Sequence, residues 1–384
     1  MEVYQVTFPK VIRFGVGALD TLGDEANKLG AKQALIVTDP GVHKAGLVDP
    51  VKEQLSRAKL SVEVFSEAEP EPTLPRLNAI AKELGKNSYD LLVGVGGGSS
   101  IDTAKGLSVL LAHGGNGQDY VGIEKVPGPG IPMFLLPTTA GTGSEVTKVA
   151  IFDDPEKGLK MGMVSHYLLA QLALVDPTLT YGCPPKITAA AGIDALAHAI
   201  ESYTSINASN FTDALELEAI RLIAGSIRTV VADGSDKAAR SHMAEGAFFA
   251  GIGIAHAGGA AVHALGHTLG SRFHVPHGVA IGLLLPYVME FNLPASLPKY
   301  ANIAQILGVK TPGLSLREAA EQGVEAVKTL TKDIGIPLHL RELGVPREAL
   351  EEMAAATLNV TRLLANNPKP LTLDDSRQIW ENAW

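Results

Sequence analysis

The sequence has a single cysteine, Cys183, among 384 residues. No disulfide can form within one chain, and such sparing use of cysteine is typical of intracellular proteins. Charged residues are also sparse, at 19%, and the net charge of -9 is not accompanied by any cluster of Lys and Arg. Nucleic acid and anionic membrane surfaces are therefore unfavourable partners.

Two kinds of apolar segment are missing as well. The N-terminus, MEVYQVTFPK, has no basic start followed by an apolar stretch, so it does not read as a secretory signal. No apolar run is long enough to span a bilayer. Apolar residues still make up 46% of the chain, enough for large buried cores. We therefore expect a cytoplasmic protein with more than one domain.

Short apolar segments alternate with helical patterns in the first half of the chain. Strands are predicted at residues 33–39, 60–65, 89–97, 131–139 and 171–176, and helices at 48–60, 75–86 and 99–113. Such alternation is typical of a mostly parallel sheet with helices on both faces. This part of the chain is predicted to be an α/β domain.

The pattern changes after Cys183, where two prolines interrupt the chain. The remainder is rich in Ala, Leu, Glu and His, and helices are predicted at residues 186–205, 210–234, 237–271 and 316–335. We therefore expect an α/β domain at 1–183 and an all-helical domain at 184–384, with the active cleft between them.

A glycine-rich turn, GVGGGSS at residues 94–100, connects a predicted strand to a predicted helix. Glycine lets a phosphate approach the backbone closely, and the N–H groups at a helix N-terminus can bind it. The spacing differs from the GxGxxG dinucleotide fingerprint. Taken alone, a turn of this kind is more often a tight structural connection.

Two further segments could contribute to a dinucleotide site. Asp39 ends an early strand, where a carboxylate can accept a hydrogen bond from a ribose 2′-OH and repel the 2′-phosphate of NADP. It could equally be a turn residue beside Pro40 and Gly41. The loop PTTAGTGSEVT, residues 137–147, offers hydroxyl and backbone donors, although it could be an ordinary polar loop.

The second half contains a candidate metal site. Asp194 and His198 are spaced so that on a helix they lie one turn apart on one face. A loop could bring His263 and His277 together, and seven of the 11 histidines fall between His198 and His277. One carboxylate and three imidazoles favour Fe²⁺ or Zn²⁺ over Mg²⁺ or Ca²⁺. There is no HExxH motif, so a zinc-protease interpretation lacks its general base.

Other histidines lie near these ligands in the sequence. His267 follows His263 by one helical turn and would point near the site without ligating. His256 and His274 are either supporting or proton-path residues, or purely structural.

Together, GGGSSIDTAK, PTTAGTGSEVT, AGIDALAHAIE, VHALGHTLG and PHGVA resemble the iron-containing (group III) alcohol dehydrogenases, in order and separation, over essentially the whole chain. The resemblance implies a Rossmann-like NAD-binding α/β domain followed by an all-α domain, a dehydroquinate synthase-like architecture. It implies an enzyme that interconverts a primary alcohol and its aldehyde by hydride transfer, with a metal polarising the substrate oxygen.

The resemblance also implies roles for particular residues. The metal ligands would be Asp194, His198, His263 and His277. The cofactor contacts would be Asp39, Gly96, Gly97, Gly98, Ser99, Asp102, Thr138, Thr139, Thr142, Ser144, Val149, Lys160 and Leu179. Asp102 would orient the glycine turn. His267 would lie near the nicotinamide and could relay the released proton.

Several alternatives stay open. Iron, zinc and other divalent ions occur in this family, and we expect Fe²⁺ first and Zn²⁺ next. Val149, Phe249, Ile254 and Leu364, expected around the substrate, are apolar and favour a simple aliphatic alcohol. The alternatives are a glycerol or diol dehydrogenase, a hydroxyacid-oxoacid transhydrogenase, or a metal-dependent lyase, which would need basic residues that are absent beside the ligands. A homodimer or larger homo-oligomer is expected, with residues 3–9 and 11–15 as strands that could pair across it.

Overall fold

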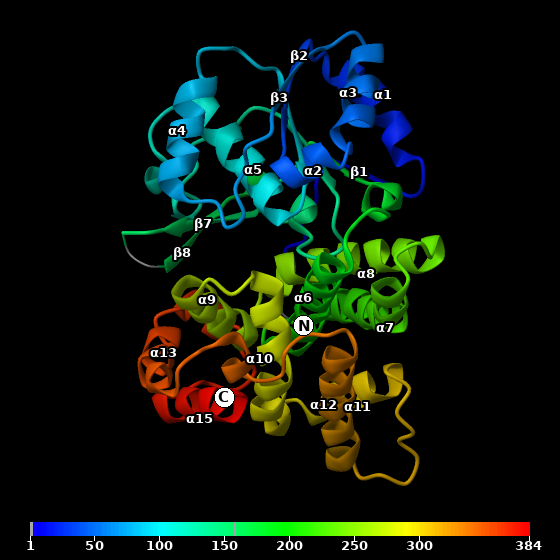
Figure 1. Cartoon of the computed structure of the whole chain (residues 1–384), viewed down its shortest axis with the longest axis vertical. Coiled ribbons are helices and arrows are strands. Elements are labelled where there is room, and N and C mark those ends of the chain that lie inside the picture. The colour runs from blue at the N-terminus through cyan, green and yellow to red at the C-terminus, as the bar shows by residue number, and fades with distance from the viewer. Residues whose placement is uncertain (1–2, 157–158) are drawn as a thin grey trace. The chain divides into compact units, whose positions relative to one another are not determined.

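The computed structural model describes residues 3–156 and 159–384. The chain divides into two compact units, Met1–Cys183 and Pro184–Trp384. The first unit combines strands and helices, and the second is built of helices (Figure 1). The predicted fold class is therefore confirmed.

A six-stranded sheet forms the centre of the first unit. Its strands are β1 (Val11–Phe14), β9 (Leu172–Val175), β6 (Met133–Pro137), β4 (Leu91–Gly96), β2 (Gln33–Val37) and β3 (Ser61–Phe65), in that order across the sheet. Every paired strand in it runs parallel, as the alternation of strands and helices predicts. The carboxyl ends of β2, β4 and β6 therefore lie at one edge, where ligands bind in open α/β sheets.

Helices cover both faces of this sheet (Figure 1). Helices α1 (Leu22–Leu29) and α3 (Val48–Arg57) pack on one face, and α4 (Leu74–Leu84) and α5 (Gly98–His113) pack on the other. Strand β2 shows why: Leu35 and Val37 join the core with α4 and α5, whereas Ala34 and Ile36 join the core with α1 and α3. Successive side chains of a strand point to opposite faces, so a strand buried on both sides is apolar throughout.

A second, smaller sheet was not predicted from the sequence. Strand β8 (Leu159–Val164) pairs antiparallel with β7 (Val149–Asp154) and parallel with the short β5 (Gly122–Ile123). Buried and half-buried positions alternate along β7. Strand β7 begins two residues after the PTTAGTGSEVT loop.

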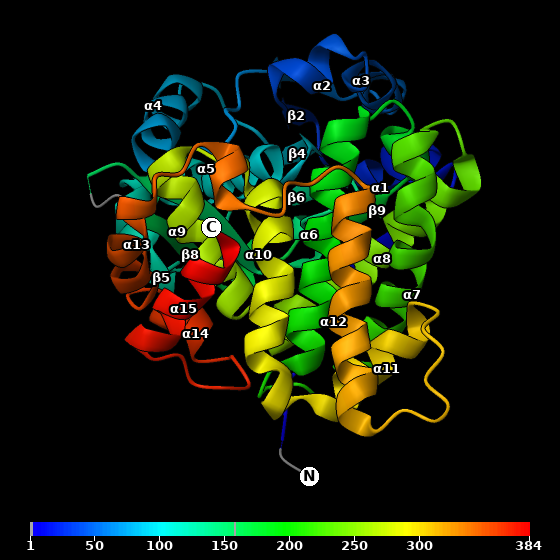
Figure 2. The ribbon, with the colours of Figure 1, turned by 60° about the horizontal axis from the view of Figure 1, so that its bottom comes forward.

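The second unit is helical over the described part of the chain. Its main helices are α6 (Pro185–Thr204), α7 (Asn210–Ala232), α8 (Lys237–Ala257), α9 (Ala261–Phe273), α10 (His277–Asn292), α11 (Leu297–Ile306), α12 (Leu316–Asp333), α13 (Leu350–Thr357), α14 (Thr361–Leu364) and α15 (Leu373–Ala383). Helices α6, α7 and α8 pack against one another, and α10 runs alongside α6 and α12 (Figure 2).

The single helix predicted over residues 237–271 is wrong. The chain forms two helices, α8 and α9, whose axes are bent by 101°. Gly258 ends α8 with a φ of 81°, a positive value that glycine adopts without strain. The break starts a new helix just before His263, and this gives that histidine a different direction from the residues of α8.

Helix α10 is more apolar than was expected from the sequence. The segment His277–Ala295, α10 with a short extension, is long and apolar enough to cross a membrane by length and composition alone. Of its most apolar window, 67% is buried inside the fold, as is usual for the core helix of a folded domain.

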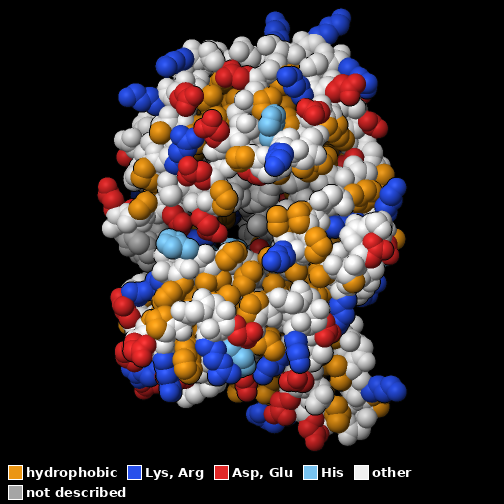
Figure 3. Space-filling view, viewed as in Figure 1, with side chains coloured by type: hydrophobic (Ala, Val, Ile, Leu, Met, Phe, Trp, Pro, Cys, Tyr) orange, Lys and Arg blue, Asp and Glu red, His pale blue; other side chains and the backbone are white. Residues whose placement is uncertain are grey.

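On the face shown in Figure 3, acidic and basic side chains are interspersed rather than gathered by sign.

Candidate active site

Two of the predicted metal ligands lie on α6. Proline at the start of a helix and a run of alanines both favour this element, whose sequence is PKITAAAGIDALAHAIESYT. Asp194 and His198 lie one turn apart on it and are buried. The His198 Nε2 atom is 3.8 Å from the Asp194 Oδ1 atom. The four-residue spacing therefore directs both side chains to the same place.

His263 and His277 approach the same aspartate from two other helices. His263 lies in the first turn of α9, and His277 begins α10. The Nε2 atom of each ring is 3.5 Å from Asp194 Oδ1. Asp194, His263 and His277 each offer one ligand atom, and these three atoms lie within 4.8 Å of one another. His198 is outside this group of three, but its ring stacks on that of His263, with 4.7 Å between centroids.

Close contact between α10 and α6 brings His277 to the cluster. A Cβ atom at Gly278 would lie 2.1 Å from the carbonyl oxygen of Ala190, and one at Gly282 would lie 2.8 Å from Ile193. Both distances are shorter than any real Cβ contact, so only glycine permits this approach. The PHGVA motif therefore contains a candidate ligand, His277, and the residue that lets its helix approach α6, Gly278.

These side chains fit a divalent transition metal. Asp194 Oδ1 and His263 Nε2 are buried, and neither has a hydrogen-bond partner among the described residues. Burial of such atoms without partners is costly. Burial favours the neutral acid, but the neighbouring His198, His277 and His263 outweigh it and hold the pKa of Asp194 below its usual range. A carboxylate facing imidazole nitrogens is a donor set suited to Fe²⁺ or Zn²⁺.

Glu201, which the sequence analysis missed, supports His263 from the other side. Its carboxylate accepts hydrogen bonds from the His263 Nδ1 atom at 2.5 Å and from the backbone N–H groups of Ala260 at 3.0 Å and Val262 at 2.6 Å. Burial disfavours a charged ring, but Glu201 and Asp194 outweigh it and raise the pKa of His263 to about 10. The available signal was the spacing, since Glu201 shares the α6 face of Asp194 and His198.

The other histidines divide into one near the cluster and two with local contacts. The His267 ring lies 5.7 Å from the His277 ring and 6.4 Å from the His263 ring, centroid to centroid. His256 Nδ1 is 2.7 Å from the carbonyl oxygen of Ile252. His274 ends α9 in the left-handed conformation and is exposed.

Apolar side chains lie in the same unit as the cluster. A Cβ at Gly259 would meet both the Ile254 side chain, at 3.3 Å, and the His263 ring, at 3.5 Å, so Ile254 lies near the His263 ring. Phe249 is on α8 beside Phe248, and Leu364 ends α14, which packs on α9. These are three of the four residues expected around the substrate.

In the first unit, the glycine turn has the shape of a phosphate cradle. Gly96 ends β4 with a φ of 152°, and α5 begins at Gly98. A Cβ at Gly98 would lie 2.8 Å from Thr142, and one at Gly97 would lie 3.5 Å from Thr139. The glycine turn therefore faces the loop at residues 137–147, which we call the hydroxyl-rich loop. Because the turn is made of glycines, no side chain of the turn lies between them. The first turn of α5, which includes Ser99, adds its N–H groups.

Asp39 caps a short helix and also contacts the residue that follows Ser99. Its Oδ1 atom accepts from the N–H groups of Gly41, at 2.8 Å, and Val42, at 3.0 Å, and so caps the short helix α2 (Pro40–Lys44). Its Oδ2 atom accepts from the Ser100 hydroxyl at 3.0 Å. One carboxylate, that of Asp39, thus both caps α2 and contacts the segment that follows the glycine turn.

The hydroxyl-rich loop is held by α5. Asp102 accepts from the Ser144 hydroxyl at 2.5 Å and from the Ile151 N–H at 2.9 Å, so its carboxylate contacts this loop and β7. Thr138 joins the glycine turn directly, because its N–H donates to the Gly96 carbonyl at 3.0 Å. The hydrogen bonds of Asp102 thus hold the loop at residues 137–147 and β7, whereas it was expected to orient the glycine turn.

Lys105, one turn after Asp102, was also missed. It is fully buried, and its Nζ atom donates to the backbone oxygens of Thr147 at 2.8 Å and Val149 at 2.7 Å. Burial lowers the pKa of Lys105 to about 8, although Asp102 and Glu145 oppose the shift. Burial likewise raises the pKa of Glu145 to about 7. These groups form a polar core beneath the loop.

The last three cofactor candidates are more dispersed. Val149 begins β7. Lys160, on β8, pairs with Glu71. Leu179 is buried in the apolar core on the α1 and α3 face of the sheet. Val149 and Lys160 thus lie in the small sheet, and Leu179 lies in the apolar core.

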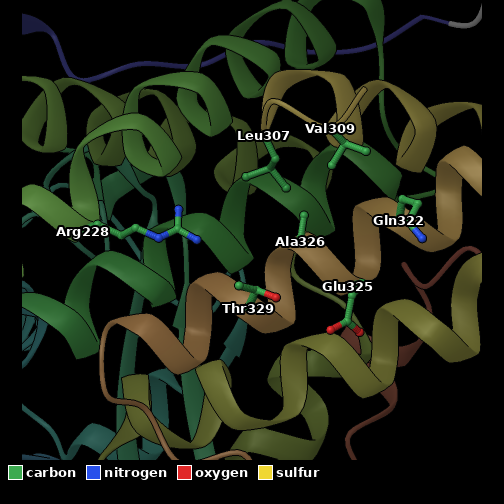
Figure 4. A pocket seen from close by; sticks show the side chains of 7 residues that line it. All are labelled: Arg228, Leu307, Val309, Gln322, Glu325, Ala326 and Thr329. Atoms are coloured by element: carbon green, nitrogen blue, oxygen red, sulfur yellow. The ribbon is translucent and has the colours of Figure 1, made fainter. Parts of the chain in front are cut away.

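A separate cavity lies in the helical unit. It measures about 310 Å³ and is lined by Arg228, Leu307, Val309 and one face of α12 (Figure 4). Arg228 pairs with Asp333 at 2.8 Å. None of the residues that line the cavity is Asp194, His198, His263 or His277, and none is a histidine. We therefore do not assign the active site to it.

Comparison with known proteins identifies the family. Residues 9–177 match the family model described as iron-containing alcohol dehydrogenase, and residues 188–384 match that of the Fe-containing alcohol dehydrogenase family, C-terminal. The chain belongs to the iron-containing alcohol dehydrogenase family. The two matched segments follow the two structural units, and the predicted family is confirmed.

Individual known proteins match along nearly their whole length. Long-chain-alcohol dehydrogenase 1 of Geobacillus thermodenitrificans is 43% identical over 388 residues, covering 100% of this chain and 98% of the relative. NAD-dependent methanol dehydrogenase of Bacillus methanolicus is 36% identical over 375 residues, 98% of each. A crystal structure of 1,3-propanediol oxidoreductase matches with a TM-score of 0.97 and 38% identity, over 100% of both chains. The predicted activity class, NAD-dependent interconversion of an alcohol and an aldehyde, is confirmed.

Proposed function

We propose that this iron-type dehydrogenase oxidises primary aliphatic alcohols with NAD, using one divalent ion held by Asp194, His198, His263 and His277. The observation that carries the proposal is the convergence of three helices on two buried atoms, Asp194 Oδ1 and His263 Nε2, that have no hydrogen-bond partner among the described residues. Fe²⁺ is the first candidate and Zn²⁺ the second, because both accept imidazole and carboxylate donors. When bound there, such an ion supplies Lewis-acid polarisation of the alcohol oxygen.

The chain's own residues supply binding and proton handling. The glycine turn and the loop with Thr139 and Thr142 would bind the cofactor pyrophosphate through backbone and hydroxyl donors. Asp39 would accept from a ribose hydroxyl and disfavour the extra phosphate of NADP. His267, beside the histidine cluster, would carry the proton released by the alcohol. Fixing the reactants in contact is the main contribution such a scaffold makes to hydride transfer.

The substrate proposal comes from apolar side chains. Ile254 lies near the His263 ring, and Phe249 and Leu364 lie in the same unit. None of the three can hydrogen-bond a second hydroxyl group, so a diol gains nothing there that a simple alcohol lacks. The relative named for long-chain alcohols is consistent with this preference.

We also propose a homodimer or larger homo-oligomer. Strand β1 is an edge strand that pairs only with β9 among the described residues. Val3, Tyr4, Phe8, Phe14 and Val16 are exposed in and around it. An open edge with apolar neighbours is suited to strand pairing between chains. The predicted strand at residues 3–9 is absent from this structure of one chain. A monomer by sedimentation would contradict the proposal.

The decisive experiment is NADH formation by protein that has been stripped with a chelator and given back Fe²⁺, Zn²⁺ or no metal. We expect activity only with metal, strongest on simple primary alcohols. Asp39→Gly should raise the use of NADP relative to NAD, and glycine is chosen because it costs a helix cap only a few tenths of a kcal/mol. An inactive protein that nevertheless binds metal and NAD would contradict the proposal. An unchanged cofactor ratio would remove the role of Asp39.

A further inference from the structure

The carboxylate of Glu201 contacts both the start of helix α9 and the ring of His263. Helix α9 begins at Ala261 after the glycine break, and its own N-cap residue, Ala260, has no side chain that could cap it. The carboxylate of Glu201 takes that place from a different helix, accepting from the N–H groups of Ala260 and Val262. The same carboxylate accepts from His263 Nδ1. Helix α9 is thus capped by the group that holds its histidine.

We propose that Glu201 is a positioning residue that prepares His263 to bind the metal. An acceptor at Nδ1 fixes the proton on that nitrogen, so the lone pair of the neutral ring is on Nε2, which faces Asp194 3.5 Å away. The bond also fixes the rotation of the ring. This inference rests on the proposed function, because it takes the four ligands as a metal site.

The geometry favours positioning over direct ligation by Glu201. Its Oε2 atom contacts Ala260 N and His263 Nδ1, and its Oε1 atom contacts Val262 N, so both oxygens are already used on the α9 side. Asp194, by contrast, presents a buried Oδ1 atom with no hydrogen-bond partner among the described residues. The two carboxylates of α6 therefore differ in role, one as ligand and one as support.

Glu201→Gln tests this role, and a matched control variant separates it from helix capping. The amide has nearly the same shape, but its NH₂ group cannot accept, so at least one of the three donors loses its partner. The matched control is Asp236→Ala, which removes a cap at the start of α8, where Asp236 accepts from the Ala239 N–H at 2.9 Å. Asp236 has no contact with any of the four ligands in the described structure.

The test measures Zn²⁺ affinity by chelator competition and thermal stability of the metal-free protein. Glu201→Gln should weaken Zn²⁺ binding by about 10- to 100-fold, the usual effect of losing a carboxylate behind a ligating histidine. Asp236→Ala should lower the melting temperature and leave Zn²⁺ affinity unchanged. Equal affinity of Glu201→Gln and wild type would overturn the inference. A wild type that binds no Zn²⁺ would instead overturn the proposed metal site, and the inference with it.

A measurement on the wild type covers the case in which Glu201→Gln does not fold. Nitrogen NMR of the Zn²⁺-loaded protein, labelled at histidine, distinguishes the two ring nitrogens. We expect His263 to keep a proton on Nδ1 and to bind Zn²⁺ through Nε2. Zn²⁺ bound through Nδ1 would overturn the inference, because that nitrogen would no longer donate to Glu201.

Discussion

At the scale of single residues, buried ionisable groups set the expected pH behaviour. Glu216, on α7, is fully buried against Ser202, and a Cβ at Gly253 would overlap its carboxyl group. Burial raises the pKa of Glu216 well above 4.5, the Ser202 hydrogen bond opposes the shift, and Asp213 adds to it. The folded protein therefore keeps a proton that the unfolded chain loses, so this group lowers stability as the pH rises above about 4.5.

Glu216→Gln tests that behaviour, because glutamine keeps the shape and cannot ionise. Relative to wild type, the variant should gain up to about 1.4 kcal/mol of unfolding free energy per pH unit between the ordinary and the raised pKa. The melting temperatures of both proteins, measured at pH 5 and pH 8, show the effect. A difference between them that is the same at the two pH values would contradict a buried, protonated Glu216.

At the scale of elements, the approach of α10 to α6 brings His277 to Asp194 and so assembles the candidate metal site. Gly278→Ala places a Cβ against the backbone of Ala190, which cannot move aside as a flexible side chain could. The start of α10, with His277, must shift, so we expect a loss of about 1–3 kcal/mol of stability and weaker Zn²⁺ binding. Chelator competition and denaturant unfolding measure the two effects.

The control is Gly225→Ala on α7. No atom lies within 4 Å of a Cβ there. Alanine in that helix should leave Zn²⁺ affinity unchanged and be neutral or stabilising by about 0.5–1 kcal/mol. Normal Zn²⁺ binding by Gly278→Ala would show that the close contact of the two helices is not what positions His277.

The helices and strands also show which features could be predicted from the sequence. Spacing along one helix was enough to group Asp194 with His198, because their relation is local. The same spacing could have placed Glu201 on the face of Asp194 and His198, but not its contacts, since its partners are 59 to 62 residues away and meet it only after the chain turns at Gly258. The same turn divided the predicted helix at 237–271. The sheet of β7 and β8 was missed because its strands are short and depend on long-range pairing.

At the scale of the whole molecule, each unit contains one kind of candidate site. All four proposed ligands belong to Pro184–Trp384, and the glycine turn, Asp39 and the hydroxyl-rich loop belong to Met1–Cys183. The motifs of the sequence and its resemblance to a family predicted this assignment of residues. The sequence alone could not supply the supporting contacts of Glu201 and Lys105, because these depend on packing between distant segments.

The central claim is that one metal ion is bound by Asp194, His198, His263 and His277. Anomalous diffraction from crystals of the Fe²⁺-loaded protein, recorded on both sides of the iron absorption edge, tests it most directly. We predict a single strong peak at about 2.0–2.2 Å from one oxygen of Asp194 and from one nitrogen of each histidine. A peak at other residues, or none in crystals of protein that oxidises alcohols, would contradict the account.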